Sequence, residues 1–131
     1  MRIPQVIFSV GLVLVVVLLL TPRRHPLAYN TSAEVRIQGV VQEVQEFYCP
    51  VSGETGTHLK VATEKGTVQV HVAPTRFLSR KQWQFVKGDP VEIVGAAVTV
   101  QGRQGLMART VIRGREVVAL REENGKPVWI N

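Results

Sequence analysis

The segment His58–Val72 reads HLKVATEKGTVQVHV, and it decides the fold. On either side of its centre, every second residue would lie on the same face of a strand; these residues are Leu59, Val61, Thr63, Val68, Val70 and Val72. A period of two is typical of half-buried strands. Between the two runs lies Glu64-Lys65-Gly66, in which glycine tolerates the positive φ of a bulged turn. The segment therefore predicts a β-hairpin.

Similar alternation extends outward from the hairpin on both sides. Three further strands are expected at 35–41, 91–100 and 106–113, with a loop over 47–56 and a break at Gly114 before 117–120. Residues 75–85 lack alternation and follow Pro74, which predicts a short helix with Phe77 and Leu78 turned inward. A closed barrel removes exposed strand edges, and a helix between the third and fourth strands is the OB-fold arrangement. We predict an all-β, five-stranded OB-like Greek-key barrel, with a small sandwich as the alternative.

The amino terminus predicts a membrane segment. Residues 3–20 carry no charge and include 14 apolar residues in 18 positions. As a helix they would span about 27 Å, close to a bilayer core of roughly 30 Å. The run exceeds the h-region of a signal peptide, so an N-terminal transmembrane helix is favoured over cleavage. The predicted divisions are an anchor at 1–22, a linker at 23–33 and the barrel domain at 34–131.

Net charge divides along the same boundary. The chain carries +6, but three of its 16 basic residues precede residue 34, which leaves 13 basic against 10 acidic residues in the domain. Arg23 and Arg24 after the apolar run would favour a cytoplasmic domain, whereas a basic stub before a Leu/Val run is typical of export. We favour a single-pass protein of the inner membrane with a periplasmic domain.

Four segments carry a resemblance to known proteins. They are GTHLKV at 56–61, VHVAP at 70–74, KGDPVEIVG at 87–95 and LR…GKPVW at 120–129. With them the chain resembles small bacterial exported or membrane-anchored OB-fold-like proteins of unknown function, which implies a fold and a compartment but no activity. The layout also resembles periplasmic haem chaperones. Their haem-attaching His and following Tyr are missing here, because no His follows His71 and no Tyr follows Tyr48. We therefore expect no cofactor.

The polar face of the predicted hairpin is the candidate ligand-binding face. Its residues are His58, Lys60, Gln69 and His71. OB folds bind oligonucleotides there through aromatic stacking, and this face has no aromatic residue, so nucleic acid is possible but not favoured. Phe47 and Tyr48 in the expected first loop would substitute, or would close the barrel mouth.

Two further clusters have competing interpretations. Arg76, Arg80 and Lys81 form a basic cluster that is either a solvated helix face or a contact for phosphate or anionic headgroups. His58, His71 and Cys49 are weak metal candidates, because their spacing matches no ligand motif. Centring the turn on Lys65-Gly66 would also place Lys60 opposite His71 and between the imidazoles. We predict surface histidines and no metal.

No motif indicates catalysis, since the chain has no Gly-x-Ser-x-Gly, phosphate loop or carboxylate pair at useful spacing. We predict a non-catalytic, membrane-tethered binding or scaffolding domain at the periplasmic face. Its expected partner is another protein or an anionic surface. The alternatives are a nucleic-acid-binding OB module facing the cytoplasm and a small metal-binding protein.

Overall fold

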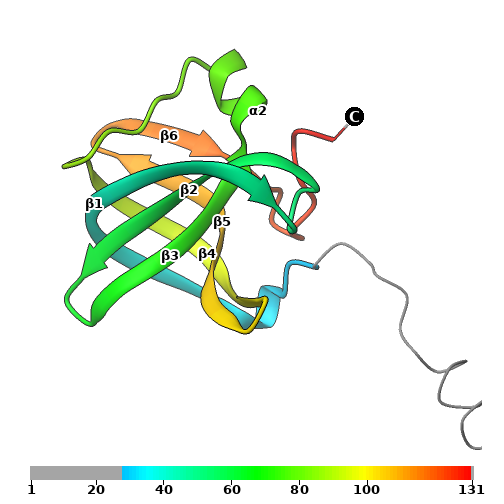
Figure 1. The fold of residues 1–131 in the computed structure, drawn as a ribbon, viewed down its shortest axis with the longest axis horizontal. Coiled ribbons are helices and arrows are strands. Elements are labelled where there is room, and N and C mark those ends of the chain that lie inside the picture. The colour runs from blue at the N-terminus through cyan, green and yellow to red at the C-terminus, as the bar shows by residue number, and fades with distance from the viewer. Residues whose placement is uncertain (1–27, 131) are drawn as a thin grey trace, which may run out of the picture.

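The computed structural model describes residues 28–130 as one small β-barrel with a short helix. In chain order its elements are η1 (Thr31–Ala33), β1 (Glu34–Cys49), β2 (Glu54–Thr63), β3 (Gly66–Pro74), α2 (Thr75–Arg80), β4 (Pro90–Val100), β5 (Arg103–Arg113) and β6 (Glu116–Ala119). The predicted hairpin is β2 and β3 (Figure 1). Among these residues, no helix has the length and apolarity to cross a membrane. The predicted anchor at 1–22 lies outside the described residues.

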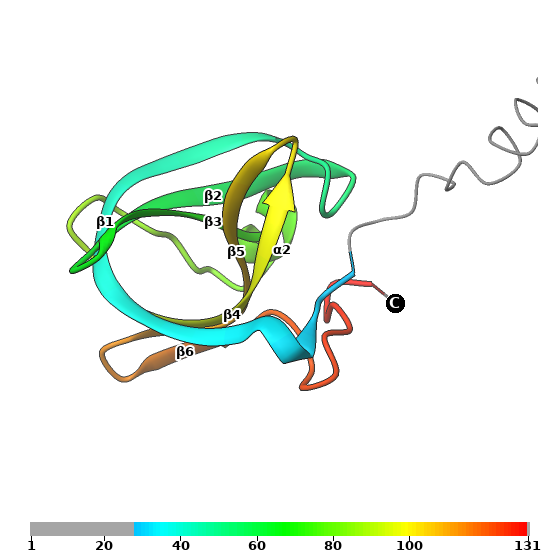
Figure 2. The ribbon, with the colours of Figure 1, turned by 90° about the horizontal axis from the view of Figure 1, so that it is seen from below.

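The six strands form one sheet in the order β3-β2-β1-β4-β5-β6. A short parallel pairing of β3 with β5 joins Val70 to Leu106 and His71 to Met107, which brings the sheet round on itself (Figures 1 and 2). The prediction of five strands was wrong by one. Gly114 adopts a φ of 62°, and the resulting turn folds β6 back against β5. The all-β class and the helix between β3 and β4 are confirmed.

The predicted loop over 47–56 is mostly strand. β1 runs on to Cys49 and pairs with β2 until Cys49 lies opposite Glu54, so only residues 50–53 turn. This long strand pairs with β4 through its first half and with β2 through its second half. The strand has a bulge between Val41 and Glu43. A bulge changes which residues face inward, so the alternation of apolar and polar residues is interrupted there.

The helix α2 closes one end of the barrel. Pro74 occupies its N-cap, and Phe77 and Leu78 are buried as predicted, although the helix ends at Arg80 rather than near 85. The Phe77 ring lies 6.0 Å from Trp129 in the C-terminal segment. The buried core beneath the helix is aliphatic and aromatic, so this end of the barrel is held by apolar burial.

A polar latch holds the N-terminal end of the described chain to the barrel. The Arg109 guanidinium on β5 donates to both Glu34 oxygens, at 2.8 and 2.9 Å, and the Tyr29 hydroxyl donates to Oε2 at 2.6 Å. These hydrogen bonds lower the pKa of Glu34 to about 2, with Arg109 the larger cause. Because both charge and geometry are matched, the latch fixes the entry of β1.

We expect E34Q to lower the free energy of unfolding by about 1 to 2 kcal/mol at pH 7, because one charge-assisted pair is lost. The folded pKa lies below the usual 4.5, so the latch stabilises the fold above that pH and loses its effect as pH falls toward 2. Urea unfolding of both proteins in detergent should therefore show a difference that shrinks between pH 5 and pH 2. A constant difference over that range would contradict the prediction.

Candidate functional site

His58 and His71 lie directly opposite each other on β2 and β3. The turn is centred on Glu64-Lys65, which pairs Thr63 with Gly66 and moves the partner of each β2 residue by two positions from the predicted register. The expectation that Lys60 faces His71 was therefore wrong. The two imidazole rings meet edge to face with their centroids 4.9 Å apart.

Both histidines are buried, which corrects the prediction of a solvent-facing polar surface. His58 has an exposed fraction of 0% and His71 one of 8%. Two parts of the barrel cover them that local alternation does not reveal. The end of β1 lies beside His58, and the parallel pairing with β5 sets Met107 beside His71.

The His58 ring is held in one orientation with a free nitrogen. Its Nδ1 lies 3.1 Å from the Gly56 carbonyl oxygen, to which it donates, while the buried Nε2 has no hydrogen-bond partner. Phe47 stacks on the ring at a centroid distance of 3.8 Å and an interplanar angle of 6°. Burial, followed by the nearby His71, lowers the pKa of His58 to about 4. The ring is therefore neutral at pH 7 and presents an unshared lone pair.

Cys49 completes the cluster from the end of β1. Its thiol is buried, and Sγ lies 3.6 Å from His71 Nδ1. One ligand atom from each of Cys49, His58 and His71 lies within 4.8 Å of the others. Burial also lowers the pKa of His71, which favours its neutral form. The structure thus brings together the three weak metal candidates of the sequence analysis.

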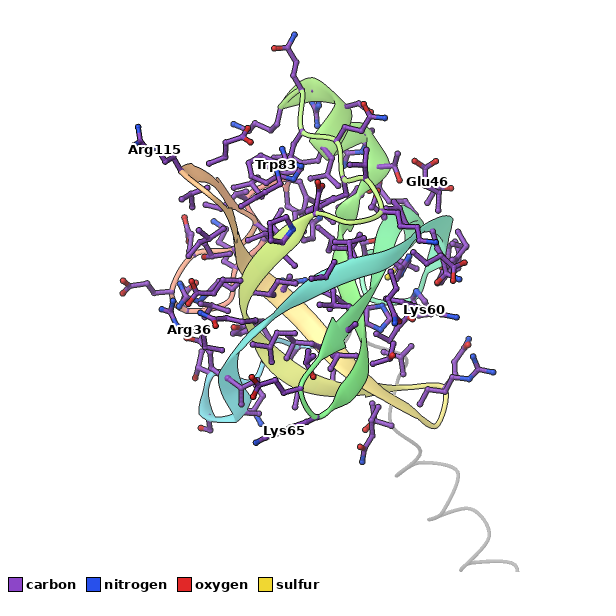
Figure 3. All side chains as sticks on the ribbon, turned by 90° about the vertical axis from the view of Figure 1, so that its left-hand side faces the viewer. Arg36, Glu46, Lys60, Lys65, Trp83 and Arg115 are labelled. Atoms are coloured by element: carbon purple, nitrogen blue, oxygen red, sulfur yellow. The ribbon has the colours of Figure 1, made fainter. Side chains whose placement is uncertain are left out.

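Lys60 does not occupy this cluster. It pairs with Gln69 across the hairpin, projects from the outer side of the barrel and places Nζ 3.5 Å from a Glu43 oxygen (Figure 3). The predicted repulsion of a cation by Lys60 between the imidazoles was therefore wrong. Of the four candidate face residues, Lys60 and Gln69 stay partly exposed while both histidines are buried.

Arg121, which the sequence analysis did not select, borders the same site. It is 6% exposed, and together with Cys49 and His71 it lines a cavity of about 10 Å³. Its Nη1 donates to the Gly125 carbonyl oxygen at 2.9 Å, its Nε has no partner, and its guanidinium lies over Trp129 at 5.0 Å. Within residues 28–130 it forms no ion pair with a carboxylate. Burial lowers the pKa of Arg121.

Comparison with protein families shows the family to which this chain belongs. The model of the MamS/MamX magnetosome protein family matches residues 33–118, which include Cys49, His58 and His71. The chain belongs to the MamS/MamX family. A search of curated proteins finds no match.

The fold of this MamS/MamX-family protein is similar to that of solved structures. A chain in the crystal structure of the S. pombe Stn1–Ten1 complex is 13% identical, with a TM-score of 0.50 over 72% of this chain and 81% of that chain. The mitochondrial single-stranded DNA binding protein Rim1 of S. cerevisiae is also 13% identical, with a TM-score of 0.45 over 71% of this chain and 98% of that chain. The structural neighbours have the OB fold.

An open groove lies beside the buried cluster in this MamS/MamX-family domain. It has a volume of about 570 Å³ and is bordered by His71, the exposed Phe47 and Tyr48, and the basic Lys60 and Arg103. The two aromatic residues come from β1 rather than from the expected loop. The groove lies on the face where OB folds take their ligands, and binding of nucleic acid there remains the alternative that the sequence did not favour.

The predicted basic cluster does not line the groove. Arg76 donates to both carboxylate oxygens of Glu54, at 2.6 and 3.1 Å, and Lys81 places Nζ 5.7 Å from the centre of the Phe77 ring. Arg80 is exposed at the end of α2. The pairing of Arg76 supports the solvated-face interpretation for that residue, and binding of headgroups by the cluster stays a prediction.

We expect F47A to move the titration midpoint of His58 from about 4 toward 6.5, because removal of the stacked ring lets water reach the imidazole. The histidine Cε1 proton, followed by NMR on metal-free protein, reports the midpoint directly. Y48A is the matched control, since Tyr48 is the next residue and 65% exposed. An unchanged His58 midpoint in F47A would contradict the shielding.

Proposed function

We propose that this MamS/MamX-family protein is a membrane-tethered, non-catalytic domain that binds one transition-metal ion through Cys49, His58 and His71. The observation that carries the proposal is the unpartnered Nε2 of His58, which is fully buried within a cluster of side chains that can coordinate a metal ion. A buried polar atom without a partner is costly, and a bound ion would satisfy it.

The chemistry of the cluster suits such an ion. Thiolate and imidazole are the donors that zinc and copper take in proteins, and metal-bound histidines usually donate their second ring nitrogen to a carbonyl or carboxylate. His58 already makes that second bond, to Gly56. Ligands of one zinc ion lie about 3.5 Å apart, close to the 3.6 Å between Cys49 Sγ and His71 Nδ1.

The surroundings of the cluster favour binding of a metal ion and not catalysis on an organic substrate. The cavity shared by Cys49, His71 and Arg121 has room for about one water molecule. His71 also borders the groove, which supplies a route for the ion and a surface for a partner protein that delivers or removes it. The basic groove residues Lys60 and Arg103 favour an acidic partner.

The location forms part of the same proposal. The apolar run at 3–20 supports a single-pass anchor in the inner membrane, and the magnetosome association of the family supports a membrane-related location. We place the domain on the periplasmic side, where the OB-like barrel would act close to the bilayer.

The full chain, purified without a His tag and dialysed against zinc, should retain one equivalent of metal by elemental analysis. The variants C49S, H58Q and H71Q should each lower the affinity by roughly a hundredfold or more, because each removes a direct ligand.

The matched control is H25Q, which removes the third histidine of the chain and should leave binding unchanged. Less than a tenth of an equivalent in the wild-type protein after exposure to zinc, copper or ferrous iron would refute the site. Equal binding by wild type and all three cluster variants would refute it as well.

Topology requires a reporter other than Cys49, because the thiol is buried. Lys65 lies at the tip of the β2–β3 hairpin, at the end of the barrel opposite Trp83 (Figure 3). The double variant C49S/K65C should react with an impermeant maleimide in intact spheroplasts. Protection until the inner membrane is broken, followed by full labelling, would place the domain in the cytoplasm.

A further inference from the structure

The donors of the Cys49–His58–His71 site are all soft or borderline. The cluster contains one sulfur and two imidazoles, and no carboxylate belongs to it within the described residues. Met107 lies opposite His71 in the β3–β5 pairing and belongs with Cys49 to a small apolar cluster that also contains Val51 and Val100. Thiolate, thioether and imidazole in an apolar setting suit a soft ion better than a hard one.

The charge around the site also constrains the ion. Arg121 and Cys49 border the same cavity of about 10 Å³, a space with room for about one water molecule. The buried guanidinium is not paired with a carboxylate in residues 28–130. With Cys49 bound as a thiolate, its negative charge balances Arg121, and the ion then determines the net charge of the site.

Burial of net charge is unfavourable. The site therefore distinguishes between ions of different charge even when those ions prefer the same ligands. A monovalent ion leaves the thiolate, guanidinium and ion together at +1, and a divalent ion leaves them at +2. The desolvation cost rises steeply with charge, and no carboxylate within the cluster offsets the second positive charge.

We infer that the ion is cuprous copper, Cu(I), and that Arg121 selects it against divalent ions. The inference rests on the proposed function, since it names the ion held by the same three ligands. Binding forms one Cu–S and two Cu–N bonds, and the Cys49 thiol proton passes to solvent, so no oxidant or reductant takes part. Arg121 touches no ligand atom of the ion in this arrangement and acts through its charge alone.

Anaerobic competition against chelators of known affinity tests the inference on the full chain in detergent, with Cu(I), Zn(II) and Fe(II) measured separately. Wild type should bind Cu(I) most tightly of the three. R121Q removes the charge but keeps a hydrogen-bond donor, and it should strengthen Zn(II) binding by roughly tenfold while changing Cu(I) binding less. R121K keeps the charge and should preserve the wild-type ratio of the two affinities.

The matched control is K65Q, because Lys65 is a cation at the tip of the β2–β3 hairpin and lines neither the cavity nor the groove. It should leave the Cu(I)-to-Zn(II) ratio unchanged. A merely structural role for Arg121 would weaken both ions equally in R121Q, and that result overturns the inference. Thermal unfolding of each variant shows whether the barrel is intact. The preference of the wild-type protein for Cu(I) over Zn(II) and Fe(II) tests the choice of ion even if a variant fails to fold.

The outcomes separate the two proposals. Tight, stoichiometric binding of Zn(II) or Fe(II) in preference to Cu(I) would overturn the choice of ion and leave the metal-binding function standing. Failure of all three ions to bind would overturn both. Cu(I) preference combined with a lowered Cu(I)-to-Zn(II) ratio in R121Q, but not in R121K or K65Q, would support both.

Discussion

The parallel pairing of β3 with β5 is the constraint on which the rest of the molecule depends. Two residue pairs, Val70 with Leu106 and His71 with Met107, join the edge strand β3 to the part of β5 that β6 does not cover. Without them both strands would present unpaired backbone groups, and the His71 side of the hairpin would face water. The same contact therefore closes the barrel and creates the interior in which a cysteine and two histidines meet.

The interior of the barrel has two parts of different character. The larger part is an apolar core that includes Phe77 and Leu78 beneath α2. Next to it lie Cys49, His58 and Arg121, and His58 Nε2 and Arg121 Nε are buried without a hydrogen-bond partner. A small fold tolerates so many buried polar groups only at a cost, and such costs concentrate at functional sites.

The local sequence pattern predicted most strands and the helix, but not which of them come into contact. The β2–β3 hairpin, the helix after Pro74 and the inward Phe77 and Leu78 follow from short-range alternation and turn chemistry, which neighbouring residues specify. The burial of His58 could not be predicted in this way. It depends on a two-residue turn that alters the register, on the continuation of β1 past a bulge, and on a strand contact between residues more than thirty positions apart. Arg121 lies in a segment that carried the family resemblance but gave no indication of a site, because its surroundings come from several separate segments.

The Glu34–Arg109–Tyr29 latch also has a mechanical consequence. A pull on the N-terminal end of the described chain reaches Tyr29 and Glu34 before it reaches the backbone hydrogen bonds between β1 and β4. The two parallel bonds from one guanidinium must stretch together, so the load is shared at the rim of the barrel.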